Sequence, residues 1–408
     1  MRVCFLTHYF PPEVGAPQTR IELLARTLAS QGTEVTVHTC FPHYPSGVVA
    51  APYRNRPWLT EDHDGVRVVR SAVYPAANQG FARRLADHAS FAVSALATAP
   101  LSGPLDVVVA ETPPLFTAAS GAAYAALKRA AYVVNVADRW PASAIELGAL
   151  RNPSAIAAAS ALERWIYRRA DLILAPTEGI VTALAEVPEA RTKARRVWPV
   201  VDLGRFDPRP PTHSPGPLRL LFAGTVGLAH GLEVLVEASR LAGPEIVQTT
   251  IAGDGADAAR IRTLVRTRGV QNVQMLGALS AEQIPALYAD ADAGAVLLRD
   301  LPIFEGALPT KLLEAMAAAR PLLLAAHGES ARLVTDAGAG LVVAPGDPLA
   351  LADGCRRLQS DPELRHALGR AGRAYAEAHF GARRAAEEWN QQLSDAVARS
   401  TPRPQAQA

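Results

Sequence analysis

The chain has 408 residues, more than a single hydrophobic core usually serves, so its length predicts two domains. Its 41 basic and 39 acidic residues leave a formal charge of +2, and this balance argues against a nucleic acid as the main partner. The chain opens directly into an apolar strand, MRVCFLT, and contains no apolar run of the roughly 18 residues that span a bilayer. We therefore expect a cytoplasmic protein.

The three cysteines are Cys4, Cys40 and Cys355. Their number is odd, their spacing does not match a metal-binding motif, and two of them lie in apparent strands. These features indicate buried, reduced thiols instead of catalytic or bridging ones.

Short apolar runs alternate with helical segments through the first half of the chain. The first such unit has a strand at 2–7, a helix at 18–31 and a strand at 34–39. Further strands are expected at 66–71, 107–110, 132–136 and 172–175. This alternation predicts an α/β domain with a parallel, doubly wound sheet, a Rossmann-like domain over residues 1–206.

A Pro-rich segment at 207–217, DPRPPTHSPGP, carries little apolar content and predicts a linker. The alternation then restarts, with strands expected at 218–223, 248–252, 273–276, 293–298 and 321–325. A second doubly wound, Rossmann-like domain is therefore predicted over 218–380.

The C-terminal part reads as helical over 361–400, with a break near 379–381. We expect the last helix, 381–400, to cross back to the first domain and residues 401–408 to form a disordered tail. Two such domains that face each other would align the loops at the carboxyl ends of both sheets along one interdomain cleft, where ligands bind.

Residues 299–326 read RDLPIFEGALPTKLLEAMAAARPLLLAA and join two acids and two cations to a helix start. Thr310 can cap a helix that begins near Lys311 and Leu312, whose free N–H groups favour an anion such as a diphosphate. Arg299 and Lys311 would share that charge. Two carboxylates, Glu305 in the loop and Glu314 in the helix, can accept hydrogen bonds from sugar hydroxyls. The alternative is an ordinary loop and amphipathic helix with solvated charges.

Two further loops contain small residues and cations. The first, THYFPPEVGAP, holds His8, Glu13 and Gly15 and precedes Arg20. It either contacts a sugar or phosphate through its backbone and the Arg20 cation, or is a tight turn with incidental polarity.

The second loop, AGTVGLAHG from Ala223, resembles phosphate-binding turns through Gly224, Thr225 and His230. A glycine pattern alone is weak evidence. His230 either donates to a phosphate or is a structural cap.

Three other segments allow two interpretations each. FPHYPSG, with His43 and Tyr44, forms an acceptor-side wall for a sugar or a rigid loop. Asp138 in ADRWP, with Glu111 in ETPPLF as a weaker candidate of the same kind, orients a sugar or caps a turn. Segment 81–101 lies on a membrane surface and meets a lipid-linked acceptor, or forms a buried helix over the sheet.

The pieces HYFPPEVGAPQTR, FPHYPSG, DRWPASAIELG, FAGTVGLAHGLE, IAGDG and LRDLPIFEGALPTKLLEAMAAARP occur in this order over residues 2–380. Together they resemble the retaining GT-B glycosyltransferases of family 4, in the subgroup of colanic-acid and O-antigen type transferases. The resemblance implies two Rossmann-like domains and a nucleoside diphosphate sugar, bound mainly by the C-terminal domain.

Family members use two glutamates separated by seven residues, with an arginine and a lysine from the loop after the first strand of that domain. Glu314 matches the second glutamate, expected at the ribose. Glu305 resembles the first, expected near the donor sugar, although eight residues intervene here. The usual cation positions are occupied by Thr225 and His230, so we expect Arg299 and Lys311 to replace them.

The resemblance implies a front-face reaction in which the leaving phosphate helps to deprotonate the acceptor hydroxyl. No metal or other cofactor is expected, because fixed cations and helix N-termini can stabilise the diphosphate, and no DxD-like pair lies in a suitable loop. Glu305, Lys311 and Asp138 are the candidate catalytic residues.

The expected activity is transfer of a hexose or N-acetylhexosamine, most simply from UDP, to a polysaccharide, lipid-linked or natural-product hydroxyl. A sugar-nucleotide epimerase, a catalytically silent homologue acting as a partner protein, and an enzyme that couples non-sugar groups are the alternatives. The expected location is cytoplasmic, with peripheral contact at the inner face of the membrane through 81–101.

Overall fold

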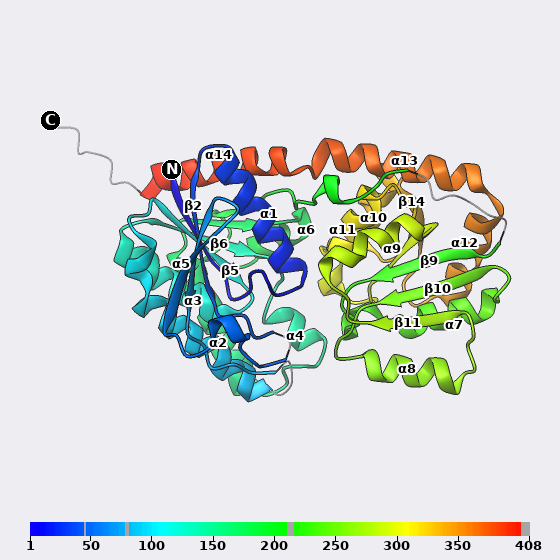
Figure 1. The fold of residues 1–408 in the computed structure, drawn as a ribbon, viewed down its shortest axis with the longest axis horizontal. Coiled ribbons are helices and arrows are strands. Elements are labelled where there is room, and N and C mark those ends of the chain that lie inside the picture. Colours follow the sequence, from blue (N-terminus) through cyan, green and yellow to red (C-terminus); the bar gives the residue numbers. More distant parts are fainter. Residues whose placement is uncertain (45, 78–80, 210–215, 401–408) are drawn as a thin grey trace. The chain divides into compact units, whose positions relative to one another are not determined.

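The computed structural model describes residues 1–44, 46–77, 81–209 and 216–400, without the side chains of 81 and 82. The chain forms two compact units, one comprising Met1–Val200 and the segment from Ala382 onward, the other Val201–Gly381. Each unit contains one β-sheet with helices on it (Figure 1). The expected tail at 401–408 and the central part of the expected linker, 210–215, lie outside the described residues.

The first unit contains an eight-stranded sheet in the order β3-β4-β2-β1-β5-β6-β7-β8. Its strands are β1 Arg2–Leu6, β2 Glu34–Cys40, β3 Trp58–His63, β4 Val66–Ser71, β5 Val107–Thr112, β6 Ala131–Val136, β7 Leu172–Ala175 and β8 Ala194–Arg196. All neighbours pair in parallel except β3 and β4. The central strands are fully buried apolar runs because helices cover both faces of a parallel sheet.

The expected strands of this unit are confirmed, but β3 and β8 were not predicted. Trp58–His63 is an edge strand, half exposed, and pairs with β4 in an antiparallel hairpin. Asp64 and Gly65 form the turn, and both have positive φ, 54° and 80°. An Asp-Gly pair between two extended runs is a hairpin signal, so the sequence contained this information. The three-residue strand β8 is too short to show a period.

Helices cover the first sheet: α1 Ala16–Ser30, α2 Phe81–Ala97, α3 Leu115–Lys128, α4 Ala142–Glu146, α5 Pro153–Arg169, α6 Glu178–Ala185 and α14 Ala382–Ser400. The C-terminal helix α14 belongs to this unit and lies beside α1 (Figure 1). Its Trp389 is buried against Phe5 of β1, with ring centroids 5.9 Å apart. Trp389 and Leu393 thereby join the core that contains β1, β5 and β6.

The second unit contains a fully parallel sheet in the order β11-β10-β9-β12-β13-β14. Its strands are β9 Leu218–Ala223, β10 Val247–Ala252, β11 Val273–Gly277, β12 Ala293–Leu297, β13 Leu322–Ala325 and β14 Gly340–Val343. The five expected strands are confirmed. The sixth, β14, was not predicted, although residues 341–343 are apolar; it is a four-residue, half-buried edge strand.

The helices of this unit are α7 Leu232–Ala242, α8 Ala258–Thr267, α9 Ile284–Asp290, α10 Thr310–Ala317, α11 Gly328–Asp336, α12 Pro348–Ser360 and α13 Pro362–His379. The expected break between the last two helices is confirmed, since α13 ends at His379 and α14 begins at Ala382.

Each sheet has one point where the chain leaves in opposite directions from two adjacent strands. In the second sheet this point lies between β9 and β12, and in the first between β1 and β5. Ligands of doubly wound folds bind outside the carboxyl ends of the strands at such a point. The loop after β9, residues 224–231, and the loop after β12, residues 298–309, are therefore the first place to look for a site in the second unit.

Candidate functional site

The start of helix α10 differs by one residue from the sequence expectation. Thr310 is the first helical residue and not the cap, and Pro309 occupies the N-cap position with φ −64° and ψ 137°. No side chain makes a capping hydrogen bond there. Thr310 cannot cap because its own φ and ψ are already helical, whereas a proline supports the extended conformation required one residue earlier. The helix start still follows directly on the loop after β12.

Lys311, in the first turn of α10, has a buried side chain, 5% exposed. Its Nζ lies 3.0 Å from Nε2 of His230 and 4.3 Å from the ring centroid of Phe222 in β9. Burial lowers the Lys311 pKa to about 7, although the negative charge of Glu314 opposes that shift. A Cβ on Gly224, whose φ is +138°, would lie 3.0 Å from Lys311 Cε, so this glycine leaves the lysine its space.

His230 holds Lys311 from the loop after β9. Its Nδ1 lies 3.0 Å from the carbonyl oxygen of Leu297, so Nδ1 carries the hydrogen and donates to that oxygen. Nε2 then offers a lone pair, which accepts a hydrogen bond from the Lys311 ammonium. Burial, followed by the charge of Lys311, lowers the His230 pKa to about 3, which keeps the ring neutral. In this state Nε2 has no hydrogen to donate to a phosphate, and the histidine instead orients the lysine.

Glu314 lies three residues after Lys311 on the same helix and is half-buried. Its surroundings raise the pKa of the carboxyl to about 7, chiefly by burial, against the opposing charges of Arg205 and Lys311. Among the residues that the structure describes, the carboxylate has no hydrogen-bond partner. It is therefore open to a ligand hydroxyl.

Arg299 follows β12 and is fixed by three contacts to the β9–α7 segment. Its backbone N–H donates to Ala229 O at 2.9 Å, and its Nε donates to Leu228 O at 2.6 Å. Its Nη2 forms an ion pair with Glu233 Oε1 at 2.7 Å. The position of the Arg299 guanidinium is thus fixed, and Glu233 partly neutralises its charge.

A cavity of about 280 Å³ opens at the same edge of the sheet. Its wall comes from the loop after β9, the start of α7 and the ends of β12 and β13: His230, Gly231, Glu233, Val234, Leu297, Leu298, Arg299, Asp300, Leu301, Ala325 and Gly346. It is concave, combines apolar walls with a few charged groups, and is close to the lower limit of small-molecule sites. His230 connects this cavity with Lys311, because it lines the cavity and contacts the Lys311 Nζ.

The other sequence candidates in this unit differ in how open their side chains are to a ligand. Leu312 is fully buried and its N–H donates to Pro309 O, so it has no free group to offer. Thr225 is exposed. The Glu305 side chain is exposed, and its backbone oxygen accepts from Glu329 N–H at the start of α11, at 2.6 Å.

In the first unit, two candidates predicted for different roles bind each other. Arg20 Nη2 of α1 lies 2.5 Å from Glu111 Oε2 at the end of β5, and the carboxylate is buried. Asn135 of β6 donates to the other Glu111 oxygen, also at 2.5 Å. Arg20 and Glu111 therefore form an ion pair at the switch point of the first sheet. Gly15 is the N-cap of α1, where a Cβ would approach Gln18 Oε1 to 2.5 Å.

The buried carboxylates of Glu13 and Asp87 hold the FPHYPSG loop in place through hydrogen bonds. Glu13 Oε1 accepts hydrogen bonds from the backbone N–H groups of His43 and Tyr44, both at 2.8 Å. His43 donates through Nδ1 to Phe41 O at 2.8 Å and through Nε2 to Asp87 Oδ2 at 3.0 Å. Burial opposes protonation of His43, but the bonds to Asp87 and Phe41 outweigh it and raise its pKa.

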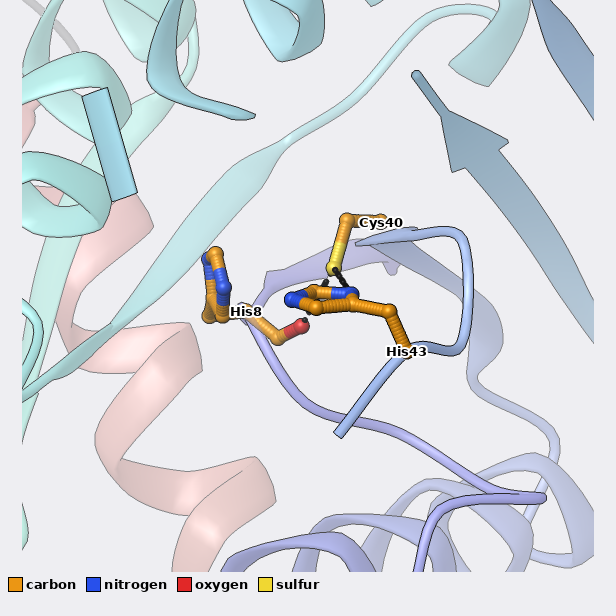
Figure 2. A group of neighbouring side chains, drawn as sticks. All are labelled: His8, Cys40 and His43. Atoms are coloured by element: carbon orange, nitrogen blue, oxygen red, sulfur yellow. Dashed lines mark hydrogen bonds between the residues drawn. The ribbon is translucent and has the colours of Figure 1, made fainter. Parts of the chain in front are cut away.

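His8 and Cys40 complete this cluster. Figure 2 shows the His8 and His43 rings beside Cys40, whose Sγ donates to the His8 carbonyl oxygen at 3.0 Å. The side chains of His8 and His43 are buried, at 0% and 3% exposure, so neither is open to an acceptor. The rigid-loop interpretation of FPHYPSG fits this geometry better than an acceptor wall built from His43, and Tyr44 is half-buried.

Three remaining sequence expectations can be compared with the structure. Asp138 is exposed and accepts a hydrogen bond from Ser143 Oγ at 3.1 Å, beside the start of α4. All three cysteines are free and buried, as expected. Within the described residues, no helix is long and apolar enough to cross a membrane. One face of α2 packs in the core through Phe91 and Ala95, while Val93 on the other face is 70% exposed.

Several residues of these sites were not found from the sequence. Glu233 lies in the first turn of α7, just after the glycine-rich turn, and pairs with Arg299 and Arg260. An acidic residue at such a helix start is visible in the sequence and could have marked Glu233 as part of the site. Phe222, Asn135 and Asp87 give no such signal, because each makes its contact with a residue that is distant in sequence.

Two family models match the chain in succession. Residues 15–200 match the model described as a glycosyl transferase 4-like domain, and residues 205–375 match the one described as glycosyl transferases group 1. The chain belongs to the group 1 glycosyltransferases. The two matches of this glycosyltransferase correspond to its two compact units.

Curated relatives of this glycosyltransferase include proteins from Escherichia coli and Streptomyces kanamyceticus. It is 26% identical over 369 residues to the putative colanic acid biosynthesis glycosyl transferase WcaI of Escherichia coli (strain K12), covering 86% of this chain and 90% of the relative. It is 30% identical over 156 residues to the alpha-D-kanosaminyltransferase of Streptomyces kanamyceticus, covering 36% and 38%.

Solved structures share the whole fold of this glycosyltransferase. Sucrose-phosphate synthase from Thermosynechococcus elongatus has 19% identity and a TM-score of 0.79, covering 97% of this chain and 99% of that one. Anabaena Alr3699/HepE, solved in complex with UDP-glucose, has 17% identity and a TM-score of 0.69, covering 98% and 99%. At these identities the likeness shows the fold, which is the GT-B class expected from the sequence.

Proposed function

We propose that this glycosyltransferase moves a hexose or N-acetylhexosamine from a UDP-sugar to an acceptor hydroxyl with retention of configuration. The observation that carries the proposal is the pair Lys311 and Glu314 on one turn of α10, at the switch point of the second sheet. One side chain is suited to a diphosphate and the other to a sugar hydroxyl.

Lys311 supplies the charge that the leaving diphosphate needs. Its Nζ is held in place by His230 and Phe222 before any ligand arrives, so the side chain needs little reorganisation when negative charge develops. The first N–H groups of α10 add their dipole at the same place. Arg299, fixed by Glu233, extends the positive surface toward the cavity.

Glu314 supplies an acceptor for the ribose. A carboxylate without a protein partner can take one or two hydroxyl hydrogen bonds, and bonds to an ionised group are stronger than neutral ones. The neighbouring cavity, lined by residues 297–301, is the candidate location for the rest of the nucleotide. Glu305, exposed in the preceding loop, is our candidate for the donor sugar. Asp138, exposed in the first unit, is a separate candidate for orienting a sugar.

The choice of UDP and of the acceptor draws on the relatives. The HepE structure was solved in complex with UDP-glucose. By their titles, one of the two relatives named above belongs to colanic acid biosynthesis and the other is a kanosaminyltransferase. We therefore propose a polysaccharide, lipid-linked or natural-product hydroxyl as acceptor. The exposed face of α2, with Arg83 and Arg84, is the proposed contact with a membrane surface when the acceptor is lipid-linked.

The proposed transfer requires no divalent metal at the diphosphate, because Lys311 and the N–H groups of α10 supply positive charge. The test is a thermal-shift and calorimetric screen against UDP, GDP, TDP and ADP, with and without magnesium. Stabilisation by UDP alone, unchanged by magnesium, is the expected result. Binding that depends on magnesium would contradict the metal-free proposal, and absence of binding by all four diphosphates would contradict the transferase proposal.

The stereochemistry is tested on the product. Once a donor is known, transfer to a panel of simple glycoside and lipid-linked acceptors can be followed by NMR of the anomeric proton. Retention of the donor configuration is expected. Inversion would contradict the retaining mechanism, and conversion of the UDP-sugar without an acceptor would show an epimerase instead.

A further inference from the structure

A group of potential metal ligands lies in the first unit, apart from the proposed donor site. His8 follows β1, and Asp87 and His88 are neighbours on α2. One ligand atom from each of these three side chains lies within 4.8 Å of the other two. His8 and Asp87 are buried and His88 is half-buried, so the group is shielded from bulk water on most sides.

The polar atoms at the centre of this group lack hydrogen bonds. Asp87 Oδ1 lies 3.2 Å from His8 Nε2, yet neither atom has a partner with hydrogen-bond geometry among the described residues, and His8 Nδ1 also has none. Leaving a buried polar group unsatisfied costs about 1–3 kcal/mol. An ion about 2.1 Å from both Nε2 and Oδ1 would use their lone pairs and remove that cost, since two ligands of one ion lie at about this separation.

The surroundings of Asp87 resemble those of metal ligands that a second hydrogen bond holds in position. The second oxygen of Asp87 accepts a hydrogen bond from His43 Nε2 at 3.0 Å, which fixes the carboxylate and leaves Oδ1 free. Ligating carboxylates in proteins are typically held by such outer hydrogen bonds. Among the residues that the structure describes, the hydrogen-bond contact of His88 Nε2 is a long one, 3.5 Å, to the hydroxyl of Tyr9.

A second group, His8, Cys40 and His43, shares His8 (Figure 2). Its other members are already engaged, because His43 donates from both ring nitrogens and Cys40 donates to the His8 carbonyl. Two imidazoles and one carboxylate with a further open position form a known zinc-binding set. We propose that His8, Asp87 and His88 bind one divalent transition-metal ion of the zinc class, which ties the end of β1 to α2.

This site is distinct from the metal-free donor chemistry proposed for the second unit. Its three ligands lie in the first unit, whereas Lys311 and Glu314 lie in the second. The two proposals can therefore be contradicted independently. Absence of zinc binding would not bear on UDP binding in the second unit, and UDP binding that is independent of magnesium would not bear on zinc binding in the first.

The proposal can be tested on the full chain by zinc binding. Protein freed of metal with a chelator is titrated with Zn²⁺ in a calorimeter, and the bound metal is counted by mass spectrometry after gel filtration. One equivalent of zinc is expected, with no binding of Mg²⁺. Asp87→Asn and His88→Ala should each weaken zinc binding by more than about 10-fold. A loss of about 10-fold is typical when only a hydrogen-bond partner of a metal ligand is removed, and removal of a ligand itself should cost more.

His366→Ala is the matched control, because His366 is an exposed histidine on α13 and should leave zinc binding unchanged. His88 is half-buried, so its variant should remain folded, which circular dichroism of the metal-free protein checks. Equal zinc affinity in wild type, Asp87→Asn and His88→Ala would overturn the proposal, as would absence of any zinc binding.

Cobalt distinguishes the two ligand groups. Co²⁺ in place of zinc should give visible ligand-field bands without a sulfur-to-cobalt charge-transfer band, and Cys40→Ser should not change the spectrum. A sulfur band that disappears in Cys40→Ser would overturn the assignment and move the ion to His8, Cys40 and His43.

Discussion

The protonation of Lys311 should couple UDP-sugar binding to the uptake of a proton. Burial lowers the pKa of this lysine to about 7 in the free protein. A diphosphate beside the ammonium favours the charged form and therefore raises the pKa in the complex. Above pH 7 the lysine is mostly neutral before binding and charged afterwards, so binding must take up a proton and must weaken as the pH rises.

The size of the effect follows from the charged fraction. With a pKa of about 7, about half of the lysine is charged at pH 7 and about a tenth at pH 8, so affinity should fall about 5-fold over that unit. Glu314, whose pKa is raised to about 7, opposes this change over the same unit, because the carboxylate fraction that can accept from the ribose rises from about a half to about 90% and reduces the net fall in affinity to about 3-fold. At pH 8 this group is about 90% ionised and contributes little to the proton uptake.

The assay is calorimetric titration with UDP-glucose at pH 8, without an acceptor, in two buffers of different ionisation enthalpy. A nucleotide sugar has no phosphate group that titrates near this pH, so the difference between buffers counts protons taken up by the protein. We expect about 0.9 proton for the wild type and none for Lys311→Met. Lys193→Met is the control, because the Lys193 ammonium contacts backbone oxygens of the first unit, away from α10 in the second.

Two results would refute this reasoning. Proton uptake near zero in the wild type would show that Lys311 is already charged in the free protein or does not meet the diphosphate. Equal uptake in the wild type and in Lys311→Met would assign the proton to another group.

Three further predictions concern the ribose contact, a strained turn and the C-terminal helix. Glu314→Gln should raise the donor KM more than it lowers kcat, and steady-state kinetics showing the reverse would exclude a ribose role. Gly328→Ala should lower the free energy of unfolding, measured by urea denaturation, by at least about 2 kcal/mol, because φ is +68° and a Cβ would lie 2.0 Å from Glu305 O. Gly346→Ala is the control: its φ is +80° but a Cβ there would meet open space, so it should cost about 1 kcal/mol. Trp389→Ala should cost about 3–5 kcal/mol in the same measurement, and a loss below 1 kcal/mol would contradict the packing of α14 on Phe5.

Most of the fold could be predicted because its strands are continuous apolar runs between helical segments. In such a parallel sheet both faces are covered, so the buried strands consist mostly of apolar residues, as in Val107–Thr112 and Leu218–Ala223. The strands that were missed are edge or very short ones, Trp58–His63, Ala194–Arg196 and Gly340–Val343, where half the residues face solvent or too few exist to show a period.

The candidate site was only partly predictable, for a related reason. Lys311 and Glu314 lie on one helix, and their spacing is visible in the sequence. The partners that give Lys311 its lowered pKa, His230 and Phe222, come from the strand and loop of β9, about 80 residues earlier, and the sequence shows no link between them. The same holds for Arg20 and Glu111, which were assigned to separate roles although the fold makes them one ion pair.

The central claim, that Lys311 binds the diphosphate of the donor, is tested most directly by calorimetric titration with UDP at pH 7. Wild type, Lys311→Ala and the control Lys193→Ala are compared, with circular dichroism to show that each is folded. We predict that Lys311→Ala binds UDP at least about 10-fold more weakly, the loss of one charge-assisted contact, while Lys193→Ala matches the wild type. Equal affinity in the wild type and Lys311→Ala would contradict the claim.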